Sequence, residues 1–147
     1  MNPNKDRILI TGGSGLVGTT LTNKLNKEGY ELLSINSSID LRDHHKCIDV
    51  FEQFKPTVVF HLAAKVGGIL ANSKYPTQFL LENIKIQNNL IENAWQIGVK
   101  RLLFLGSSCI YPKFAHQPIK EDSLLTGQLE ETNQWYGIAK IAGIKLC

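Results

Sequence analysis

Two side chains near the end of the sequence have the types and the spacing that suit proton transfer. Tyr136 and Lys140 are four residues apart, which brings two side chains to one face of a helix, one turn from each other. An ammonium group beside a phenol favours the phenolate and lowers a pKa that is otherwise about 10. We therefore expect Lys140 to lower the pKa of Tyr136, so that the phenol acts as a general acid and base near neutral pH. The spacing alone is common, because a surface lysine beside a half-buried tyrosine gives the same pattern.

A serine pair and a cysteine lie further back, in the stretch LGSSCIYPK at residues 105–113. Ser107 and Ser108 close an apolar run, and Cys109 follows them. A serine hydroxyl can hydrogen-bond the substrate oxygen that a tyrosine protonates. A thiol with a pKa of about 8.5 can exchange a proton with a carbon next to a carbonyl if its site lowers that value. The alternative for Cys109 is a place in the core, since cysteine is one of the most buried residue types.

A glycine cluster occupies the segment ITGGSGLVGT at residues 10–19. Gly12, Gly13, Gly15 and Gly18 match both G-x-x-G-x-x-G and G-x-G-x-x-G, between an apolar segment and an amphipathic one. Such glycines let the backbone approach a pyrophosphate, while the N-terminus of the following helix supplies free N–H groups and partial positive charge. The cluster predicts dinucleotide binding. A glycine-rich turn without a ligand is the alternative.

The end of the second apolar segment bears on which dinucleotide is bound. A site for NAD has Asp or Glu there, hydrogen-bonded to the ribose hydroxyls, whereas this chain has INSS at residues 35–38. Because residues 35–38 contain no carboxylate, nothing at this place repels a 2′-phosphate. Asn and Ser can donate hydrogen bonds to the phosphate oxygens, and Arg42 is close in sequence. The sequence therefore favours NADP. The next acid, Asp40, is expected past the strand, where it could meet the adenine.

The elements that must position these groups alternate along the chain. Four apolar runs predict buried strands, at residues 7–11, 30–36, 57–64 and 100–108. Four periodic segments predict helices, at residues 15–29, 43–54, 76–97 and from 135 onward. Residues 112–134 are polar and predict a long loop. Strands that alternate with helices indicate an α/β fold with a doubly wound, Rossmann-type parallel sheet.

Composition excludes several classes of protein. With 147 residues, 43% of them hydrophobic and 20% charged, the chain has the balance of a globular protein with one core. The formal net charge of +3 comes from scattered Lys and Arg, which does not indicate nucleic-acid binding. No apolar run approaches the roughly 20 residues of a membrane span. The three cysteines and four histidines lack metal-ligand spacing, so we expect no metal and a reduced, cytoplasmic setting.

Five strings are similar to one protein family: TGGSGLVG, HLAAKVGGI, FLGSSCIYPK, QPIKEDSLLTG and YGIAKIAGIKLC. They resemble the extended short-chain dehydrogenase/reductase family and, within it, the GDP-L-fucose synthase members, from about Arg7 to the last residue. The strings AAKVGGI and GSSCIYPK are the most diagnostic. The resemblance implies NADPH-dependent conversion of GDP-4-keto-6-deoxy-D-mannose to GDP-L-fucose, by epimerisation at C3 and C5 and reduction of the C4 ketone.

The resemblance also implies roles for individual residues. Ser107 would polarise the C4 carbonyl, and Tyr136 would donate its proton. Lys140 would tune Tyr136 and hold the nicotinamide ribose, and Cys109 would act as acid or base in the epimerisation. The cofactor would be bound by loop and strand-end residues: Gly12, Gly13, Ser14, Gly15, Leu16, Val17, Gly18, Asn36, Asp40, Leu41, Leu62, Ala63, Ala64, Leu105, Gly106, Ser107, Ser108 and Lys140. Cys47 and His61 are expected to pack rather than react.

The chain also departs from the family pattern. The second epimerisation residue of the family, a histidine, would lie beyond Cys147, as would the remaining strands and the domain that binds the GDP-sugar. The resemblance therefore implies an incomplete sheet, with about four strands in the order 3-2-1-4. We therefore expect residues 1–147 to be the N-terminal part of the NADP-binding domain of a longer, homodimeric enzyme, inactive alone. Two alternatives remain: another nucleotide-sugar epimerase or dehydratase of the family, and a catalytically silent NADP-binding module.

Overall fold

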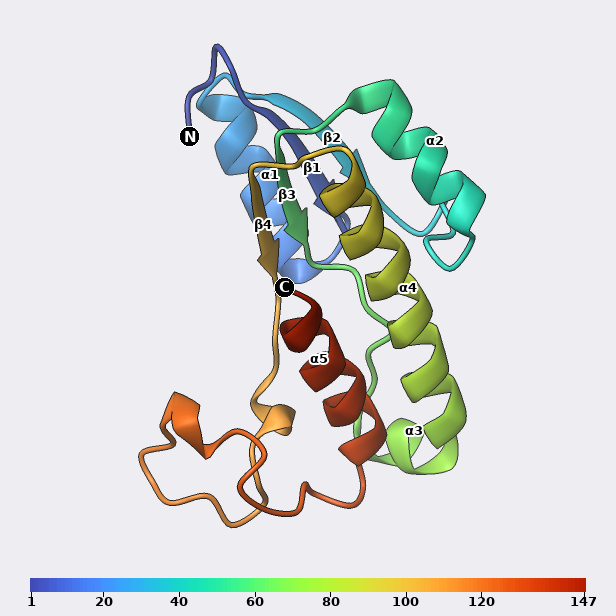
Figure 1. Ribbon diagram of the computed structural model, residues 1–147, viewed down its shortest axis with the longest axis vertical. Coiled ribbons are helices and arrows are strands. Elements are labelled where there is room, and N and C mark those ends of the chain that lie inside the picture. Colours follow the sequence, from blue (N-terminus) through green and yellow to red (C-terminus); the bar gives the residue numbers. More distant parts are fainter. The chain divides into compact units, whose positions relative to one another are not determined.

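Four parallel strands form a single sheet in the computed structural model, which describes residues 1–147 (Figure 1). The strands are β1 (Arg7–Thr11), β2 (Glu31–Ile35), β3 (Val58–His61) and β4 (Arg101–Phe104). The helices are α1 (Leu16–Lys27), α2 (His44–Phe54), α3 (Ile69–Lys74), α4 (Pro76–Gln96) and α5 (Gln134–Leu146). Two short 3-10 helices complete the list, η1 (Ser108–Ile110) and η2 (Glu121–Ser123). Every strand and helix that the sequence predicts is present.

The chain divides into two compact units. The first comprises Met1–Ala64, Lys85–Leu105 and Cys147, and it contains the sheet, α1, α2 and the second part of α4. The second comprises Lys65–Ile84 and Gly106–Leu146, and it contains α3, the first part of α4, both 3-10 helices and α5. No helix of the structure combines the length and the apolar character that crossing a membrane requires.

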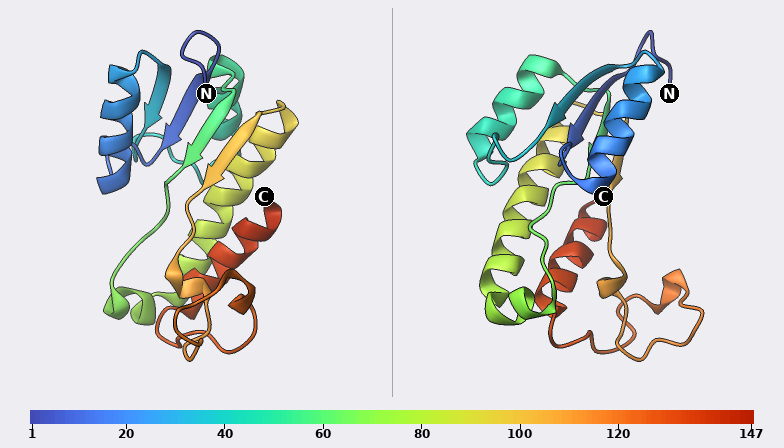
Figure 2. Two further views of the ribbon diagram at one scale, coloured as in Figure 1. Left: turned by 90° about the vertical axis from the view of Figure 1, so that its left-hand side faces the viewer. Right: turned by 180° about the vertical axis from the view of Figure 1, so that it is seen from behind.

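The alternating side chains of β1 supply two cores on opposite faces of the sheet. Leu9 packs with Phe51 of α2 and Leu90 of α4, whereas Ile8 and Ile10 pack with Leu25 of α1. The three β1 side chains have no exposed surface, as expected for a strand that is covered on both faces. Helix α1 therefore covers one face, and α2 with the second part of α4 covers the other (Figure 2).

The strand order is β2-β1-β3-β4, and all neighbours are parallel. The doubly wound parallel sheet is confirmed, including the side-by-side placement of strands 2 and 1. The literal order 3-2-1-4 needs a correction, because it places the third strand outside β2, and β3 pairs with β1 instead. Residues 36–43 form turns in which Asn36 Oδ1 accepts from Ser38 N and Asp40 Oδ1 accepts from Arg42 N. Such local hydrogen bonds compete with strand pairing, so the outer edge of β2 stays open.

Three strands end together: β1 ends where its apolar run ends, whereas β3 and β4 end earlier than theirs. Thr11, His61 and Phe104 stand opposite one another as the last residues of β1, β3 and β4. The chain leaves β1 for the glycine cluster, so the residues after His61 and Phe104 have no ladder to continue. Ser107 and Ser108 consequently do not end β4 but lie beyond it, at the start of η1. The short elements α3, η1 and η2 are not predicted from the sequence.

Candidate active site

The loops that follow β1 and β3 begin side by side at the carboxyl edge of the sheet. The Thr11 hydroxyl accepts from the Ala63 backbone N–H at 3.1 Å and lies 2.9 Å from His61 Nδ1. A hydroxyl has one proton and two lone pairs, so Thr11 can bond both groups at once. Both side chains are buried, and the expectation that His61 packs at a strand end is confirmed. The contact fixes the start of the glycine loop against the start of the loop after β3.

The glycine loop needs its glycines for its own packing. Gly12 has φ +73°, the left-handed region that glycine adopts readily, and a Cβ there would lie 3.0 Å from Ala63 N. A Cβ at Gly13 would overlap Ser34 Oγ, and one at Gly18 would overlap the Gly12 carbonyl oxygen. Helix α1 thus packs closely on the loop. This is the cradle that a pyrophosphate-binding loop requires.

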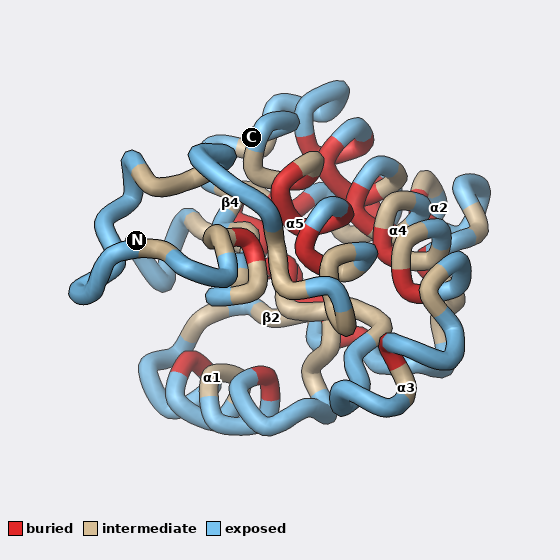
Figure 3. The backbone as a smooth tube through the Cα atoms, turned by 90° about the horizontal axis from the view of Figure 1, so that it is seen from below, coloured by how far each residue is buried: buried red, intermediate tan, exposed pale blue.

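The first turn of α1 is open to solvent and free of negative charge. Gly15 is the N-cap without a side-chain hydrogen bond, and no acid stands in the first turn. Leu16 is 92% exposed, and most of α1 lies at the surface (Figure 3). The first N–H groups of a helix have no partner within it, and they carry partial positive charge. The loop and this helix end fit an anionic pyrophosphate.

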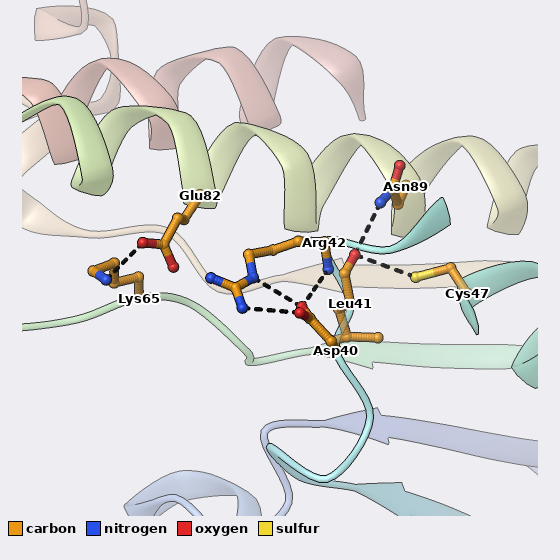
Figure 4. A network of polar contacts seen from close by, with 7 residues as sticks. All are labelled: Asp40, Leu41, Arg42, Cys47, Lys65, Glu82 and Asn89. Carbon is orange, nitrogen blue, oxygen red and sulfur yellow. Dashed lines mark hydrogen bonds and ion pairs between the residues drawn. The ribbon is translucent and has the colours of Figure 1, made fainter. Parts of the chain in front are cut away.

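The turn after β2 is held by side chains from two helices. Asn89 Nδ2 donates to the Leu41 carbonyl oxygen at 2.9 Å, and Cys47 Sγ donates to the same oxygen at 3.5 Å (Figure 4). Burial raises the pKa of the Cys47 thiol to about 11. The expectation that Cys47 is structural is confirmed, because a fully buried thiol with this pKa is not a nucleophile near neutral pH.

Arg42, which the sequence places near a 2′-phosphate, lies beside Asp40. Its Nε and Nη2 donate to the two Asp40 carboxylate oxygens, each at 2.8 Å (Figure 4). These bonds lower the pKa of Asp40 to about 2. Asp40 lies past the strand as predicted, and its charge is balanced by the guanidinium, which lessens its repulsion toward a phosphate.

The second unit brings together the four residues to which the sequence analysis assigns chemistry. Ser107 Oγ accepts from Cys109 N at 3.3 Å, and α5 packs against η1 so closely that a Cβ at Gly137 would lie 2.6 Å from the Cys109 carbonyl oxygen. The charge of Cys109 acts on Tyr136, and Lys140 Nζ lies 5.8 Å from the centroid of the Tyr136 ring. Ser107, Cys109, Tyr136 and Lys140 therefore form one cluster.

The expected effect of Lys140 on Tyr136 is wrong. Burial, with a further contribution from Cys109, raises the pKa of the phenol. Lys140 is itself only 3% exposed, and burial lowers its pKa to about 8. Its ammonium lies over the face of the ring, where its charge does less for the hydroxyl oxygen than an ion pair would. In this structure Tyr136 holds its proton more strongly than a free phenol.

Two asparagines that the sequence analysis missed hold the loop after β3. Asn83 Oδ1 accepts from Lys65 N at 2.8 Å, and Asn83 Nδ2 donates to the Lys65 carbonyl at 3.0 Å. Asn72 Nδ2 donates to the carbonyls of Gly67 and Gly68. The Lys65 ammonium pairs with Glu82 at 2.7 Å (Figure 4). Asparagines at i, i+11 inside helical segments are a weak signal, and no pattern in the sequence distinguishes them from surface amides.

The candidate residues divide between the two units. The first unit holds Gly12, Gly13, Ser14, Gly15, Leu16, Val17, Gly18, Asn36, Asp40, Leu41, Leu62, Ala63, Ala64 and Leu105. The second holds Gly106, Ser107, Ser108, Cys109, Tyr136 and Lys140. Asn133, which the sequence analysis missed, contacts Cys109: its Nδ2 lies 3.2 Å from the sulfur. Nothing in the sequence pattern signals this contact, because it joins segments 24 residues apart.

A parallel sheet with a glycine loop at its carboxyl edge and a serine–tyrosine–lysine cluster defines an α/β protein of the dinucleotide-binding class. The comparison with known families agrees with this class. The chain belongs to the NAD dependent epimerase/dehydratase family, whose model matches residues 8–147.

Relatives with curated names share about half of the residues. The chain is 50% identical to GDP-L-fucose synthase 1 of Arabidopsis thaliana, over 100% of this chain and 46% of the relative. It is 48% identical to GDP-L-fucose synthase of Escherichia coli, over 97% and 45%. The chain thus spans about half the length of the curated relatives it matches.

Solved structures have the same fold. One is MlghC, a GDP-mannoheptose C4 reductase from Campylobacter jejuni with NADP bound, with a TM-score of 0.94 and 37% identity, over 100% of this chain and 47% of that chain. Another is a GDP-L-fucose synthetase from Naegleria fowleri bound to NADP, with a TM-score of 0.87 and 34% identity, over 99% and 47%.

Proposed function

We propose that this chain is the N-terminal, NADP-binding part of an enzyme that converts GDP-4-keto-6-deoxy-D-mannose to GDP-L-fucose, epimerising C3 and C5 and reducing the C4 ketone with NADPH. The observation that carries the proposal is the cluster of Ser107, Cys109, Tyr136 and Lys140 on η1 and α5, in a chain about half identical to GDP-L-fucose synthases.

The first unit supplies the residues for the cofactor, and NADPH supplies the hydride when bound. The glycine loop, residues 12–18, and the open end of α1 take the pyrophosphate, because the first N–H groups of a helix have no partner within it and no acid stands in the first turn to oppose an anion. Asn36, Asp40 and Leu41 surround the adenosine with its 2′-phosphate. No carboxylate stands at residues 35–38, and Arg42 neutralises Asp40. Residues 62–64 and 105–108, together with Lys140, take the nicotinamide end.

Ser107 and Tyr136 act on the oxygen of the C4 carbonyl. The serine hydroxyl hydrogen-bonds and polarises it, and the phenol gives it a proton as the ketone becomes an alcohol. A raised pKa suits this task, because Tyr136 is then fully protonated near neutral pH. Lys140 holds the nicotinamide ribose. Because its pKa is near 8, its ammonium can return a proton to the Tyr136 phenolate once the alcohol has formed.

Cys109 serves the epimerisation. A carbon next to the C4 carbonyl loses its proton to the thiolate, the C–H bond breaks, an S–H bond forms, and the electron pair is held as an enolate. An acid on the opposite face of the ring then returns a proton to that carbon, which inverts it. This second acid is proposed to belong to the part of the enzyme outside residues 1–147, along with the domain that binds the GDP-sugar and with the homodimer contacts. A cytoplasmic location fits the free thiols.

The proposal separates binding from turnover, and two measurements test it. Fluorescence titration of the 147-residue chain with NADPH is expected to show binding, tighter than with NADH. The keto-sugar is expected to leave NADPH unoxidised with this chain alone. The longer enzyme is expected to oxidise NADPH with the keto-sugar, and Tyr136→Phe to abolish the oxidation while binding persists. A longer enzyme that binds NADPH but never oxidises it contradicts the proposal and favours a silent binding module.

A further inference from the structure

Asn133, the residue before α5, hydrogen-bonds the sulfur of Cys109 through its side-chain nitrogen, while its side-chain oxygen makes no hydrogen bond. Nδ2 donates to Cys109 Sγ at 3.2 Å. Oδ1 is buried and has no hydrogen-bond partner. A buried polar atom without a partner is unfavourable and calls for an explanation. The amide is therefore placed for the sulfur at the expense of its own oxygen.

The backbones on both sides of this contact are fixed. Asn133 N donates to the Glu130 carbonyl at 3.2 Å, and the Asn133 carbonyl accepts from Gly137 N at 3.0 Å in the first turn of α5. Cys109 N donates to Ser107 Oγ at 3.3 Å, and the Cys109 carbonyl lies against Gly137. The distance between the amide and the sulfur is thus set by two anchored segments.

A residue that gains and loses a proton needs a different partner in each state. A thiolate accepts hydrogen bonds, whereas a thiol donates one, and an asparagine amide carries a donor on one side and an acceptor on the other. As it stands, Nδ2 is placed to stabilise the thiolate. Turned by half a rotation about its last bond, the amide presents Oδ1 to the S–H.

We propose that Asn133 is a positioning residue for Cys109, which gives the sulfur a hydrogen bond both as thiolate and as thiol. The inference rests on the proposed function, in which Cys109 exchanges a proton with a carbon next to the substrate carbonyl. The amide changes orientation during that exchange and neither gains nor loses an atom. Its orphaned oxygen is the acceptor that the protonated sulfur will use.

Other titratable groups near the sulfur remain the same when Asn133 is replaced. From α5, Tyr136 interacts with the charge of Cys109, and Lys140 lies over the Tyr136 ring. The remaining residues of η1, Ser108 and Ile110, do not titrate. A change in the thiol pKa on replacing Asn133 therefore reports the amide.

The test measures the pKa of Cys109 in the full 147-residue chain, as the pH dependence of alkylation by iodoacetamide followed by intact mass. The background is Cys147→Ser, because Cys147 is exposed and Cys47 is buried. Asn133→Leu is expected to raise the thiol pKa by about one unit, which lowers the alkylation rate at pH 7 about tenfold, since the bond to the thiolate is lost. Asn133→Asp, similar in shape but an acceptor with negative charge, is expected to raise it at least as much.

The neighbouring variant Gln134→Leu is the matched control and is expected to leave the thiol pKa unchanged. A thiol pKa within about 0.3 unit of the parent in both Asn133 variants overturns the proposal. Circular dichroism reports folding: if the Leu variant unfolds, the Asp variant decides, and unfolding of both assigns the amide to structure alone and also overturns it. The measurement needs no substrate, so a parent enzyme without turnover would contradict the proposed function while a shifted thiol pKa still supports the role of Asn133.

Discussion

Replacing Lys140 with methionine is expected to make the protein more stable at neutral pH. Lys140 is only 3% exposed, and burial lowers its pKa from 10.5 to about 8. At pH 7 the ammonium is charged in the folded and in the unfolded chain, so the folded state carries the whole penalty of burying it. A shift of about 2.5 units, at about 1.36 kcal/mol per unit, makes this penalty about 3 kcal/mol. Methionine has a similar length and no charge, so Lys140→Met is expected to raise the free energy of unfolding by about that amount.

The sign of the pH dependence identifies the cause. Between pH 8 and 10.5 the unfolded chain keeps the Lys140 proton and the folded chain has released it, so the stability of the parent rises with pH in that window. Methionine has no such dependence. The advantage of Lys140→Met is therefore expected to be complete below pH 8, to shrink by about 1.4 kcal/mol per pH unit above it, and to vanish near pH 10.5.

Urea denaturation of parent and variant at several pH values from 7 to 10 measures this difference. Taking the difference cancels the contributions of groups away from Lys140 that ionise in the window, such as Cys47. Lys24→Met removes an exposed lysine of α1 and is expected to leave the stability within about 0.5 kcal/mol of the parent. The reasoning is refuted if Lys140→Met is no more stable than the parent at pH 7, or if its advantage is the same at every pH.

Three further predictions follow from the same structure. Burial raises the pKa of the Cys47 thiol from 9.0 to about 11, so the thiol ionises first in the unfolded chain and the parent loses about 3 kcal/mol of stability between pH 9 and 11. Cys47→Ala is expected to abolish this loss. If the free energies of unfolding of parent and variant, from urea denaturation, fall equally over this range, the prediction is wrong. Gly18→Ala is expected to weaken NADPH binding at least about tenfold in a fluorescence titration, because its Cβ overlaps the Gly12 carbonyl oxygen. Gly68→Ala, which has open space around its Cβ, is the control and is expected to keep the affinity. Equal affinities of the two variants would contradict the prediction. Leu90→Ala, at a position without exposed surface, is expected to lower the free energy of unfolding by about 3 kcal/mol, and a loss below about 1 kcal/mol would mean that the core closes over the gap.

The parts of the fold that follow from local sequence were predictable. Asp43 was expected to open a helix, and its side chain accepts from the backbone N–H groups of His45 and Lys46. Pro76 begins α4 as expected. The position of the third strand was not predictable in the same way. It is set by the pairing of β3 with β1, between residues about 50 apart in the sequence, and no local or periodic pattern specifies which neighbour a buried strand takes.

For the site, residue types were predictable and electrostatics were not. The sequence placed Ser107, Cys109, Tyr136 and Lys140 in one proposal, and the structure gathers them in one unit. Spacing in a helix fixes which side chains are neighbours, but it does not fix their burial. The pKa of Tyr136 therefore moves opposite to the expected direction. The contact of Asn133 with Cys109 depends on packing of α5 against η1, which joins segments 24 residues apart.

The Asn83 amide pairs with both main-chain groups of Lys65, as a neighbouring strand would if the sheet continued. Asn72 donates to the carbonyl oxygens of Gly67 and Gly68. The side chains of Asn72 and Asn83 therefore hold the backbone of this loop. The side chains of Val66, Ile69 and Leu70 are all more than 60% exposed, so they contribute little to holding this loop in place. Substitutions of these three side chains would therefore change the surface of the protein more than the course of its backbone, which Asn72 and Asn83 hold.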